Sequence, residues 1–323
     1  MTHTIGVDVG GTKISAGVVD ATGVVLVHDR VDTPAADPGG IEASIADLVA
    51  RLGRRVGGSE AVSAVGVAAA GFVAGDAATV RFAPNIAWRD HDLGGRLAAL
   101  TGLPVVVEND ANAAGWAEFC FGEVSGVREL VCLTLGTGLG GAIVSQGRLL
   151  RGSQGMAAEL GHLRVVPDGE PCGCGQRGCW EQYVSGGALT RRARRAVVER
   201  PDEAAGLLAH RAQGDPASVE LVSGRCVIAA ARAGDPLACE LVTDLGRWLG
   251  EGVATLCAVI DPAAVVVGGG LAAEADLYLP AARAALERAL PGRSHRDLPR
   301  LVASTVHAEA GIVGAAALAR AAS

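Results

Sequence analysis

Apolar residues along this chain gather in short strand-like runs and in helix-like spacing, and the two patterns alternate. Residues 4–23 contain two apolar runs joined by a turn of glycine and threonine, and a second glycine-containing turn leads into a third run. Residues 130–147 repeat this order of run, turn, run and turn. The repeat predicts a duplicated β-hairpin unit that opens each of two related domains.

The rest of the chain alternates between the two periodicities. Apolar residues at helical spacing predict helices at residues 41–56, 93–100, 110–119, 187–200, 216–233, 236–258, 275–290 and 311–322. Short apolar runs predict further strands at residues 62–68, 103–107, 263–267 and 300–306. Strands that alternate with helices are typical of an α/β protein. We expect a small α/β domain over 1–109, a large one over 110–306, and a C-terminal helix at about 307–323 that returns to the small domain.

The composition fits two domains and excludes some partners. The 323 residues are enough for two domains of ordinary size, and half of them are hydrophobic. The formal net charge of −7 offers no basic surface for nucleic acid or for an anionic membrane. The first residues lack the basic and apolar regions of a signal peptide, and Asp261 and Pro262 interrupt the longest apolar stretch. We therefore expect a cytoplasmic protein that binds neither nucleic acid nor membrane.

One segment concentrates cysteine and histidine, with glycines that let the backbone turn tightly. Its candidate metal ligands are His162, Cys172, Cys174 and Cys179. Three thiolates and an imidazole suit a tetrahedral zinc ion, and four protein ligands close its shell, so we expect the zinc to be structural. A redox pair or a chance cluster is the alternative, which the spacing and the lack of a secretion signal disfavour. Glu159 and Glu181 flank the ligands, which suggests the wall of a small polar site.

A glycine turn follows the first apolar run. In the sequence DVGGTK, Gly10 and Gly11 allow positive φ, so that backbone N–H groups can form a nest for phosphate. Thr12 adds a hydroxyl, and Asp8 can hold a hydrated magnesium ion. Lys13 is the only lysine in the chain, which suggests that a role beside the phosphate requires it. An ordinary hairpin turn is the alternative.

A second turn of the same kind contains Gly136, Thr137 and Gly138. Neither turn fits the P-loop pattern, and neither opens a helix as a dinucleotide-binding fingerprint does. Two such hairpins could together hold the phosphates of one nucleotide. The triplet of Gly268, Gly269 and Gly270, between a strand and a helix, could leave a flat surface for adenine and ribose. The arginines within 191–195 are expected to form a solvated helix face and not an anion site.

Asn109 and Asp110 lie where a predicted strand ends and a predicted helix begins. Asp110 suits the N-cap of this helix, and the helix terminus would favour its ionised form. An ionised Asp110 could accept the proton of a hydroxyl that attacks phosphorus. Asn85, in the loop PNIAW, offers an amide, and amides and carboxylates are the groups that bind a polyol. An ordinary turn asparagine is the alternative for Asn85.

Together these motifs resemble the ROK family of sugar kinases, most closely its bacterial, actinobacterial-type glucokinases that contain zinc. The family pattern GHxxVxxxGxxCxCGxxGCxE matches residues 161–181 in full, and DVGGTK, PNIAW, VVVENDANAA, TLGTGLGG and VVGGG occur in the family's order. The resemblance implies an actin-like fold, with two ribonuclease H-like domains that close over ATP and sugar and with an inserted zinc knuckle. It also implies that glucose is phosphorylated at the 6-hydroxyl, with ATP as the donor and magnesium bound to the ATP.

The resemblance also implies a role for each motif. Asp110 would be the general base, and His162 would use one ring nitrogen for zinc and the other for the sugar. The implied sugar-binding residues are Gly71, Asn85, Asn109, Asp110, Glu159, His162 and Glu181. The implied ATP-binding residues are Asp8, Gly10, Gly11, Thr12, Lys13, Gly136, Thr137, Gly138, Gly268, Gly269 and Gly270. One departure from the family is Ala142, where many relatives continue the glycine run.

Three alternatives stay open beside glucose and ATP. A ROK kinase could act on another hexose, such as N-acetylmannosamine or fructose, because relatives share the carboxylates and amides. Polyphosphate could be the donor, although relatives that use it generally lack the cysteine knuckle. A ROK transcriptional repressor is the least favoured, since it needs a winged-helix segment ahead of the first hairpin, and here the first apolar run begins at Ile5. Family likeness also suggests a homodimer or homotetramer.

Overall fold

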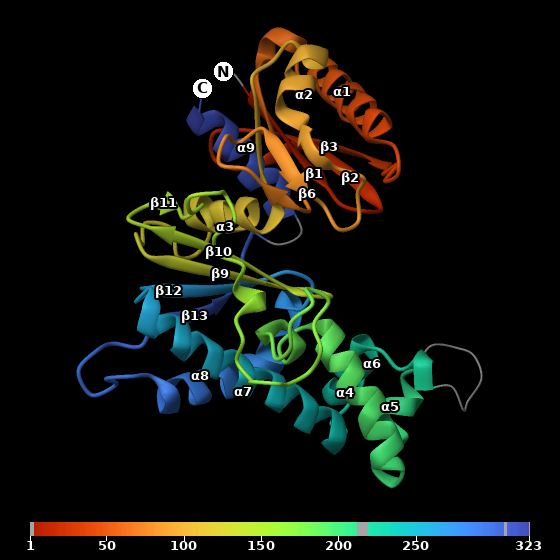
Figure 1. Cartoon of the computed structure of the whole chain (residues 1–323), viewed down its shortest axis with the longest axis vertical. Coiled ribbons are helices and arrows are strands. Elements are labelled where there is room, and N and C mark those ends of the chain that lie inside the picture. Colours follow the sequence, from red (N-terminus) through yellow and green to blue (C-terminus); the bar gives the residue numbers. More distant parts are fainter. Residues whose placement is uncertain (1–2, 212–218, 307–308, 323) are drawn as a thin grey trace. The chain divides into compact units, whose positions relative to one another are not determined.

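The computed structural model describes residues 3–211, 219–306 and 309–322, and Figure 1 labels many of its elements. The chain divides into two compact units. Unit 1 contains Met1–Cys132, Gly141–Ala158 and Thr305–Ser323, and unit 2 contains Leu133–Gly140 and Glu159–Ser304. These compact units need not coincide with the two domains predicted from the sequence, so the boundary expected at residue 109 stays a prediction. Of the C-terminal helix expected over 307–323, residues 307, 308 and 323 lie outside the described residues.

Unit 1 is built on a five-stranded sheet of order β3-β2-β1-β4-β8. The strands are β1 His3–Val9, β2 Lys13–Val19, β3 Val25–Asp32, β4 Val62–Ala69 and β8 Val105–Asn109. The first three strands form the antiparallel hairpins that the sequence predicts. β4 pairs parallel with β1, and β8 pairs parallel with β4, so that Val9, Ala69 and Asn109 are register partners at one end of the sheet. The residues that follow them therefore leave the sheet close together.

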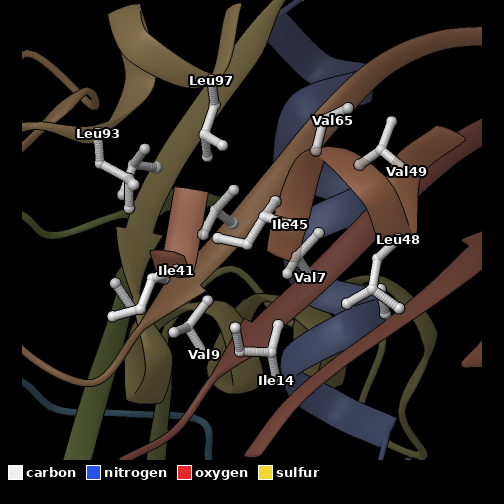
Figure 2. Packing of buried hydrophobic residues seen from close by; sticks show 14 of the residues in the cluster. Val7, Val9, Ile14, Ile41, Ile45, Leu48, Val49, Val65, Leu93 and Leu97 are labelled. Atoms are coloured by element: carbon white, nitrogen blue, oxygen red, sulfur yellow. The ribbon is translucent and has the colours of Figure 1, made fainter. Parts of the chain in front are cut away.

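Helices cover both faces of this sheet, because successive side chains of a strand point to opposite faces. The helices of unit 1 are α1 Pro38–Arg55, α2 Leu93–Thr101, α3 Asp110–Phe121 and α9 Ala310–Ala322. On one face, Ile41 of α1 and Leu97 of α2 pack with Val7 in the core that Figure 2 shows. On the other face, Gly6 and Gly66 let α9 approach the strands, since a Cβ on either glycine would overlap a carbonyl oxygen of α9. The sheet therefore has a side-chain core on one face and a close backbone contact on the other.

A small three-stranded sheet lies in the chain between β4 and α2, and the apolar pattern did not reveal it. Its strands are β5 Phe72–Val73, β6 Thr79–Phe82 and β7 Arg89–Asp92. These strands are too short to show a period, and β7 is polar throughout. The loop PNIAW connects β6 and β7, and the buried side chains of Ile86 and Trp88 anchor it. The small sheet therefore holds the loop that presents Asn85.

A second five-stranded sheet has the order β11-β10-β9-β12-β13. Its strands are β9 Leu130–Leu135, β10 Leu139–Ser145, β11 Arg148–Leu149, β12 Ala264–Gly268 and β13 Arg300–Ala303. In both sheets, the first strand of the hairpin lies between its hairpin partner and a strand from later in the chain. This repeated order confirms the duplicated hairpin unit that the sequence predicts.

Helices fill much of unit 2. They are α4 Gly186–Glu199, α5 Ala205–Ala209, α6 Gly224–Arg232, α7 Pro236–Val259 and α8 Ala275–Ala289. The helix predicted over 216–233 begins at Gly224 in the structure, and residues 216–218 lie outside the described part of the chain. α7 packs closely on α8 at Gly246 and Gly250, where a Cβ would overlap carbonyl oxygens of α8. None of the helices described combines the length and the apolar character that a membrane span requires.

Candidate active site

Three predicted motifs follow the carboxyl ends of β1, β4 and β8, whose last residues are register partners. The glycine turn that starts at Gly10 follows β1, Gly71 comes shortly after β4, and Asp110 follows β8. Asn109 Nδ2 donates to the carbonyl oxygen of Gly71 over 3.0 Å, which links two of these strand ends. The carboxyl ends of parallel strands are where an α/β protein usually binds its ligand. This end of the sheet is therefore the first part of the candidate site.

Asp110 is the first residue of α3, and its neighbour Asn109 is the N-cap. Asn109 Oδ1 accepts the N–H of Asn112 over 3.0 Å. Asp110 Oδ1 accepts the N–H of Ala111 at 2.9 Å and Nδ2 of Asn109 at 3.2 Å. The prediction that Asp110 caps the helix was therefore wrong by one residue, because the side chain of Asn109 fills the capping position.

Burial raises the pKa of Asp110 above its ordinary value. The helix terminus was expected to favour the ionised carboxylate, and hydrogen bonds from backbone N–H groups and from Asn109 do lower this pKa. Desolvation is the larger effect, so the net shift of the pKa is opposite to the effect of the helix terminus alone. A carboxylate with a raised pKa accepts a proton more readily than an ordinary aspartate, which suits a general base.

A buried carboxylate supports this junction, and the sequence reasoning did not single it out. Glu108, the last residue but one of β8, is 3% exposed. Its Oε1 accepts the N–H of Asn109 at 3.1 Å and Nδ2 of Asn112 at 3.0 Å, and its Oε2 accepts Nε of Arg151 at 2.7 Å. The motif VVVENDANAA did carry a signal, because a glutamate inside a buried strand needs partners that offset its desolvation.

The turn between β1 and β2 is closed by the N–H of Gly10, which donates to the carbonyl oxygen of Lys13 at 3.0 Å. Neither Gly10 nor Gly11 has the positive φ that the sequence suggested. A Cβ on Gly11 would lie 3.1 Å from Cβ of Asn85, which is closer than an ordinary contact. The glycine therefore brings the PNIAW loop against the turn.

Asp8 points to the face of the sheet that α9 covers, against Gly311. Its pKa is raised to about 6, first by burial and second by the charge of Asp110, while the charge of Lys13 lowers it. Asp8, Lys13 and Asp110 are thus within electrostatic range of one another. A divalent cation relieves the repulsion between two carboxylates, so this arrangement suits one. A cavity of about 530 Å³ lies beside Asp8 and Lys13.

His162, Cys172, Cys174 and Cys179 form a cluster that could hold a metal ion, with their ligand atoms all within 4.8 Å of one another. Sγ of Cys174 and Sγ of Cys179 are 3.6 Å apart, and Sγ of Cys172 lies 3.7 Å from Nδ1 of His162. Zn–S bonds of about 2.3 Å in a tetrahedron require S–S separations of about 3.8 Å, so the cluster fits such an ion. The N–H of Gln176 lowers the pKa of Cys174, which favours the thiolate that a metal needs.

The two glutamates that flank this cluster lie in different surroundings. Glu159 immediately precedes the 3-10 turn η2 Leu160–His162, and its carbonyl oxygen accepts the N–H of His162 at 3.0 Å. Glu181 lies in the 3-10 turn η3 Trp180–Gln182, and its Oε2 accepts the N–H of Leu139 at 3.0 Å. Glu181 therefore contacts the backbone just after the second glycine turn.

A cavity of about 910 Å³ lies beside this second turn within unit 2. Gly136, Thr137 and Gly270, three of the residues singled out in the sequence, contribute to its lining. The sequence reasoning did not assign the rest of the lining, which is Gly186, Gly187, Thr190, Arg191, Arg194, Ser223, Gly224, Arg225 and Leu271. Gly269, in the triplet after β12, has a φ of 82°, which glycine adopts without strain.

Arg191 and Arg194 correct the expectation of a solvated arginine face on α4. Both are half-buried and line the cavity. Arg191 donates to the carbonyl oxygen of Gln182 at 2.8 Å, and Arg194 donates to the carbonyl oxygen of Val222 at 2.9 Å. The charge pattern was misleading for these two residues because each donates to a part-buried carbonyl group of a neighbouring segment, whereas Arg195 on the same helix is exposed.

The predicted site residues are divided between the two units. Unit 1 contains Asp8, Gly10, Gly11, Thr12, Lys13, Gly71, Asn85, Asn109 and Asp110. Unit 2 contains Gly136, Thr137, Gly138, Glu159, His162, Cys172, Cys174, Cys179, Glu181, Gly268, Gly269 and Gly270. Each group combines a glycine turn with carboxylate side chains. Groups of this kind can bind phosphates and hydroxyl-rich ligands.

Comparison with known proteins identifies the family. The chain matches the ROK family over residues 4–322. It belongs to the ROK family. It is 49% identical over 317 residues to a glucokinase of Streptomyces coelicolor, across 98% of this chain and 97% of that protein. It is 33% identical over 327 residues to an N-acetylmannosamine kinase of Escherichia coli, across 98% of both chains.

A solved structure of a ROK family glucokinase from Streptomyces griseus, in complex with glucose and AMPPNP, is similar throughout. The TM-score is 0.85 at 47% sequence identity, and the match covers 99% of both chains. The actin-like α/β fold of a ROK sugar kinase, which the motifs imply, is therefore confirmed. Because relatives that act on different sugars share this fold, the sugar must be argued separately.

Proposed function

We propose that this ROK protein transfers the γ-phosphoryl group of ATP to the 6-hydroxyl of glucose. The similarity to a Streptomyces glucokinase, and to a glucokinase structure that holds glucose and AMPPNP, supports this activity. One observation in this chain carries the proposal. Asp110, a half-buried carboxylate with a raised pKa, lies within electrostatic range of Asp8 at the end of the sheet where the glycine turn begins.

In the proposed reaction, Asp110 accepts the proton of the 6-hydroxyl while the sugar oxygen attacks the γ-phosphorus. A bond forms between the sugar oxygen and phosphorus, and the bond to the bridging oxygen of ATP breaks, so that ADP leaves. Asp110 then returns its proton to solvent. The raised pKa makes this carboxylate a better acceptor at the moment of transfer.

We assign sugar binding to Gly71, Asn85, Asn109, Asp110, Glu159, His162 and Glu181. Carboxylates, amides and an imidazole can pair with the donors and acceptors of ring hydroxyls. Asn109 is held in place before any ligand arrives, because its Oδ1 caps α3 and its Nδ2 binds the carbonyl oxygen of Gly71. Such preorganisation reduces the entropy that binding costs.

We assign nucleotide binding to the two glycine turns and the glycine triplet. The residues are Asp8, Gly10, Gly11, Thr12, Lys13, Gly136, Thr137, Gly138, Gly268, Gly269 and Gly270. The cavity of about 910 Å³ beside the second turn supports ATP over polyphosphate, because adenosine needs such a space and polyphosphate does not. Magnesium, which Asp8 would hold, neutralises charge on the phosphates.

We propose that the metal of the cysteine and histidine cluster is zinc and that its role is structural. The distances between the ligand atoms suit a tetrahedral ion, and four protein ligands leave no open position for substrate. We assign Nδ1 of His162 to the metal, because it lies 3.7 Å from Sγ of Cys172, and this leaves Nε2 for the sugar. A homodimer or homotetramer and a cytoplasmic location stay predictions.

Another hexose is the second candidate, and the 33% identity to an N-acetylmannosamine kinase supports it. A coupled assay of the purified protein tests the proposal, with ATP or polyphosphate as donor and glucose, N-acetylmannosamine or fructose as acceptor. Formation of glucose 6-phosphate from ATP, detected with a dehydrogenase specific for that product, is the expected result. No transfer to any of the three sugars would refute the kinase activity.

A further inference from the structure

The metal-ligand segment leads directly into the second glycine turn. Cys179 is the last cysteine of the cluster, and the 3-10 turn η3 follows it at once. Ser185 then caps α4, with its hydroxyl accepting the N–H of Ala188 at 3.0 Å. The segment 179–187 therefore connects a candidate metal ligand directly to the first turn of α4.

Two sets of hydrogen bonds fix the turn of Gly136–Gly138 to this segment. The N–H groups of Gly186 and Gly187 donate to the carbonyl oxygens of Gly136 and Thr137, at 2.8 and 3.1 Å. Oε2 of Glu181 accepts the N–H of Leu139, the residue just after the turn, at 3.0 Å. The turn is therefore held on both sides by residues of 179–187.

Gly138 leaves room for this carboxylate, because a Cβ there would overlap Oε2 of Glu181 and displace it. Glu181 is itself held by its neighbours. Gln182 Nε2 donates to its Oε1 at 3.1 Å. The fully buried Trp180 donates its indole N–H to the carbonyl oxygen of Trp248, in α7, at 3.0 Å. The carboxylate can therefore link η3 to the turn through a hydrogen bond of fixed geometry.

We infer that Glu181 is a positioning residue for the phosphate-binding turn, so that the metal segment sets nucleotide affinity even when no sugar is bound. This inference rests on the proposed function, which assigns the nucleotide to that turn. It gives Glu181 a task beyond sugar binding. A charge-assisted hydrogen bond to a backbone N–H can hold the turn in the one shape that cradles phosphate.

Binding of AMPPNP with magnesium, in the absence of sugar, tests the inference by isothermal titration calorimetry. Glu181→Met keeps the length of the side chain and removes the acceptor, so AMPPNP affinity should fall by about tenfold, as for the loss of one hydrogen bond to a charged group. Glu181→Gln keeps an oxygen that can accept the N–H of Leu139. It should hold AMPPNP within about threefold of the unchanged protein while glucose affinity falls.

Glu170→Met is the matched control, because Glu170 lies in the same metal-binding loop and pairs with Arg195 at 2.8 Å. It should leave AMPPNP affinity unchanged. Metal content and thermal unfolding are measured for every variant, so that a loss of fold is seen directly. Removal of the metal from the unchanged protein by a chelator should lower AMPPNP affinity in the same direction as Glu181→Met.

The outcomes separate the inference from the proposed function. Equal AMPPNP affinity for the unchanged protein and for folded, metal-loaded Glu181→Met, with glucose affinity lost, would overturn the inference and leave the kinase proposal standing. Failure of the unchanged protein to bind AMPPNP at all would overturn the proposed function, and the inference with it. A tenfold loss in Glu181→Met with near-normal binding in Glu181→Gln supports both.

Discussion

Glu108 and Arg151 form an ion pair of 2.7 Å between Oε2 and Nε, and the glutamate of this pair is buried. The pair joins β8 to a residue that follows β11 in the chain. Because Glu108 also accepts the N–H of Asn109 and Nδ2 of Asn112, it fixes the strand-to-helix junction from which Asp110 projects. A pair of this kind is costly to break from one side, since the other charge stays buried.

Replacement of Arg151 should therefore affect both stability and turnover. Arg151→Gln leaves Glu108 without its charged partner, so we expect a loss of about 1–3 kcal/mol in the free energy of unfolding. Turnover should fall by about tenfold, because the junction that holds Asp110 loosens. Arg151→Lys should recover part of both. Arg128→Gln, which removes an exposed arginine from the same unit, should change neither by urea unfolding and steady-state kinetics.

Asp110→Asn separates the proposed base from the local structure. Asn109 is the cap of α3, so the helix should survive the change. The amide cannot accept the proton, and we expect turnover to fall by about 100-fold or more. Glucose should still bind, as measured by calorimetry. Near-normal turnover in this variant would show that another group takes the proton.

Asp8 makes a prediction about pH, because its pKa is raised from 3.8 to about 6. The folded protein holds this proton more tightly than the unfolded chain does, so stability falls as pH rises from about 4 to about 6 and stays lower above that range. Asp8→Asn removes this effect. At pH 7 the variant should be more stable by roughly 1–3 kcal/mol, and at pH 4 the two proteins should be nearly equal.

Urea unfolding at both pH values measures this difference. The same variant should lose most of its activity with ATP, because Asp8 is the proposed magnesium ligand. If the difference in stability between Asp8→Asn and the unchanged protein were the same at both pH values, Asp8 would titrate normally. Retained activity with ATP would show that Asp8 is not the magnesium ligand.

The elements of both sheets follow from local periodicity, and for this reason the sequence predicted them well. The repeat at 4–23 and 130–147 appears as the hairpins β1–β2 and β9–β10. The long helix α7 was predicted over 236–258 and spans Pro236–Val259. The strands of the small sheet were missed because they are short and lack an apolar run, and β7 is polar throughout.

The site was harder to predict, because its details depend on tertiary contacts. Which of Asn109 and Asp110 caps α3 depends on the side-chain conformation of Asn109. The pKa of Asp110 depends on its burial in the folded chain, and the role of Glu108 depends on Arg151. The sequence predicts a solvated face for Arg191 and Arg194, because it does not show their backbone partners.

Metal content tests the zinc proposal directly. We expect about one zinc ion per chain by elemental analysis, since the cluster offers one set of four ligands. Cys174→Ser should lose the metal and also glucose affinity, because Glu159, His162 and Glu181 would no longer be held together. Cys239→Ser, which removes an exposed cysteine outside the cluster, is the control. Active, well-folded protein without zinc would refute the proposal.

Glucose itself is the last prediction, and it rests on the polar character of the proposed sugar residues. Asn85, Asn109, Glu159, His162 and Glu181 are amides, carboxylates and an imidazole, which lose hydrogen bonds when a ligand hydroxyl is missing or replaced. N-acetylmannosamine carries an acetamido group at the 2-position, so it removes one hydroxyl partner and adds a methyl group. We expect glucose to be preferred by about 100-fold or more in kcat/KM.

The comparison needs one preparation of enzyme, saturating ATP, and both sugars measured by the same coupled release of ADP. Mannose is a useful third substrate, because it has the 2-position geometry of N-acetylmannosamine without the acetamido group. A large loss of kcat/KM for N-acetylmannosamine and a smaller loss for mannose would assign the discrimination to the acetamido group. This is the expected result if polar groups of the site are left unpaired by that group. Equal or reversed specificity would instead make this chain a ROK kinase for another hexose. The assignment of Asp110 as the base would be unaffected, because proton transfer at the 6-hydroxyl does not depend on the group at the 2-position.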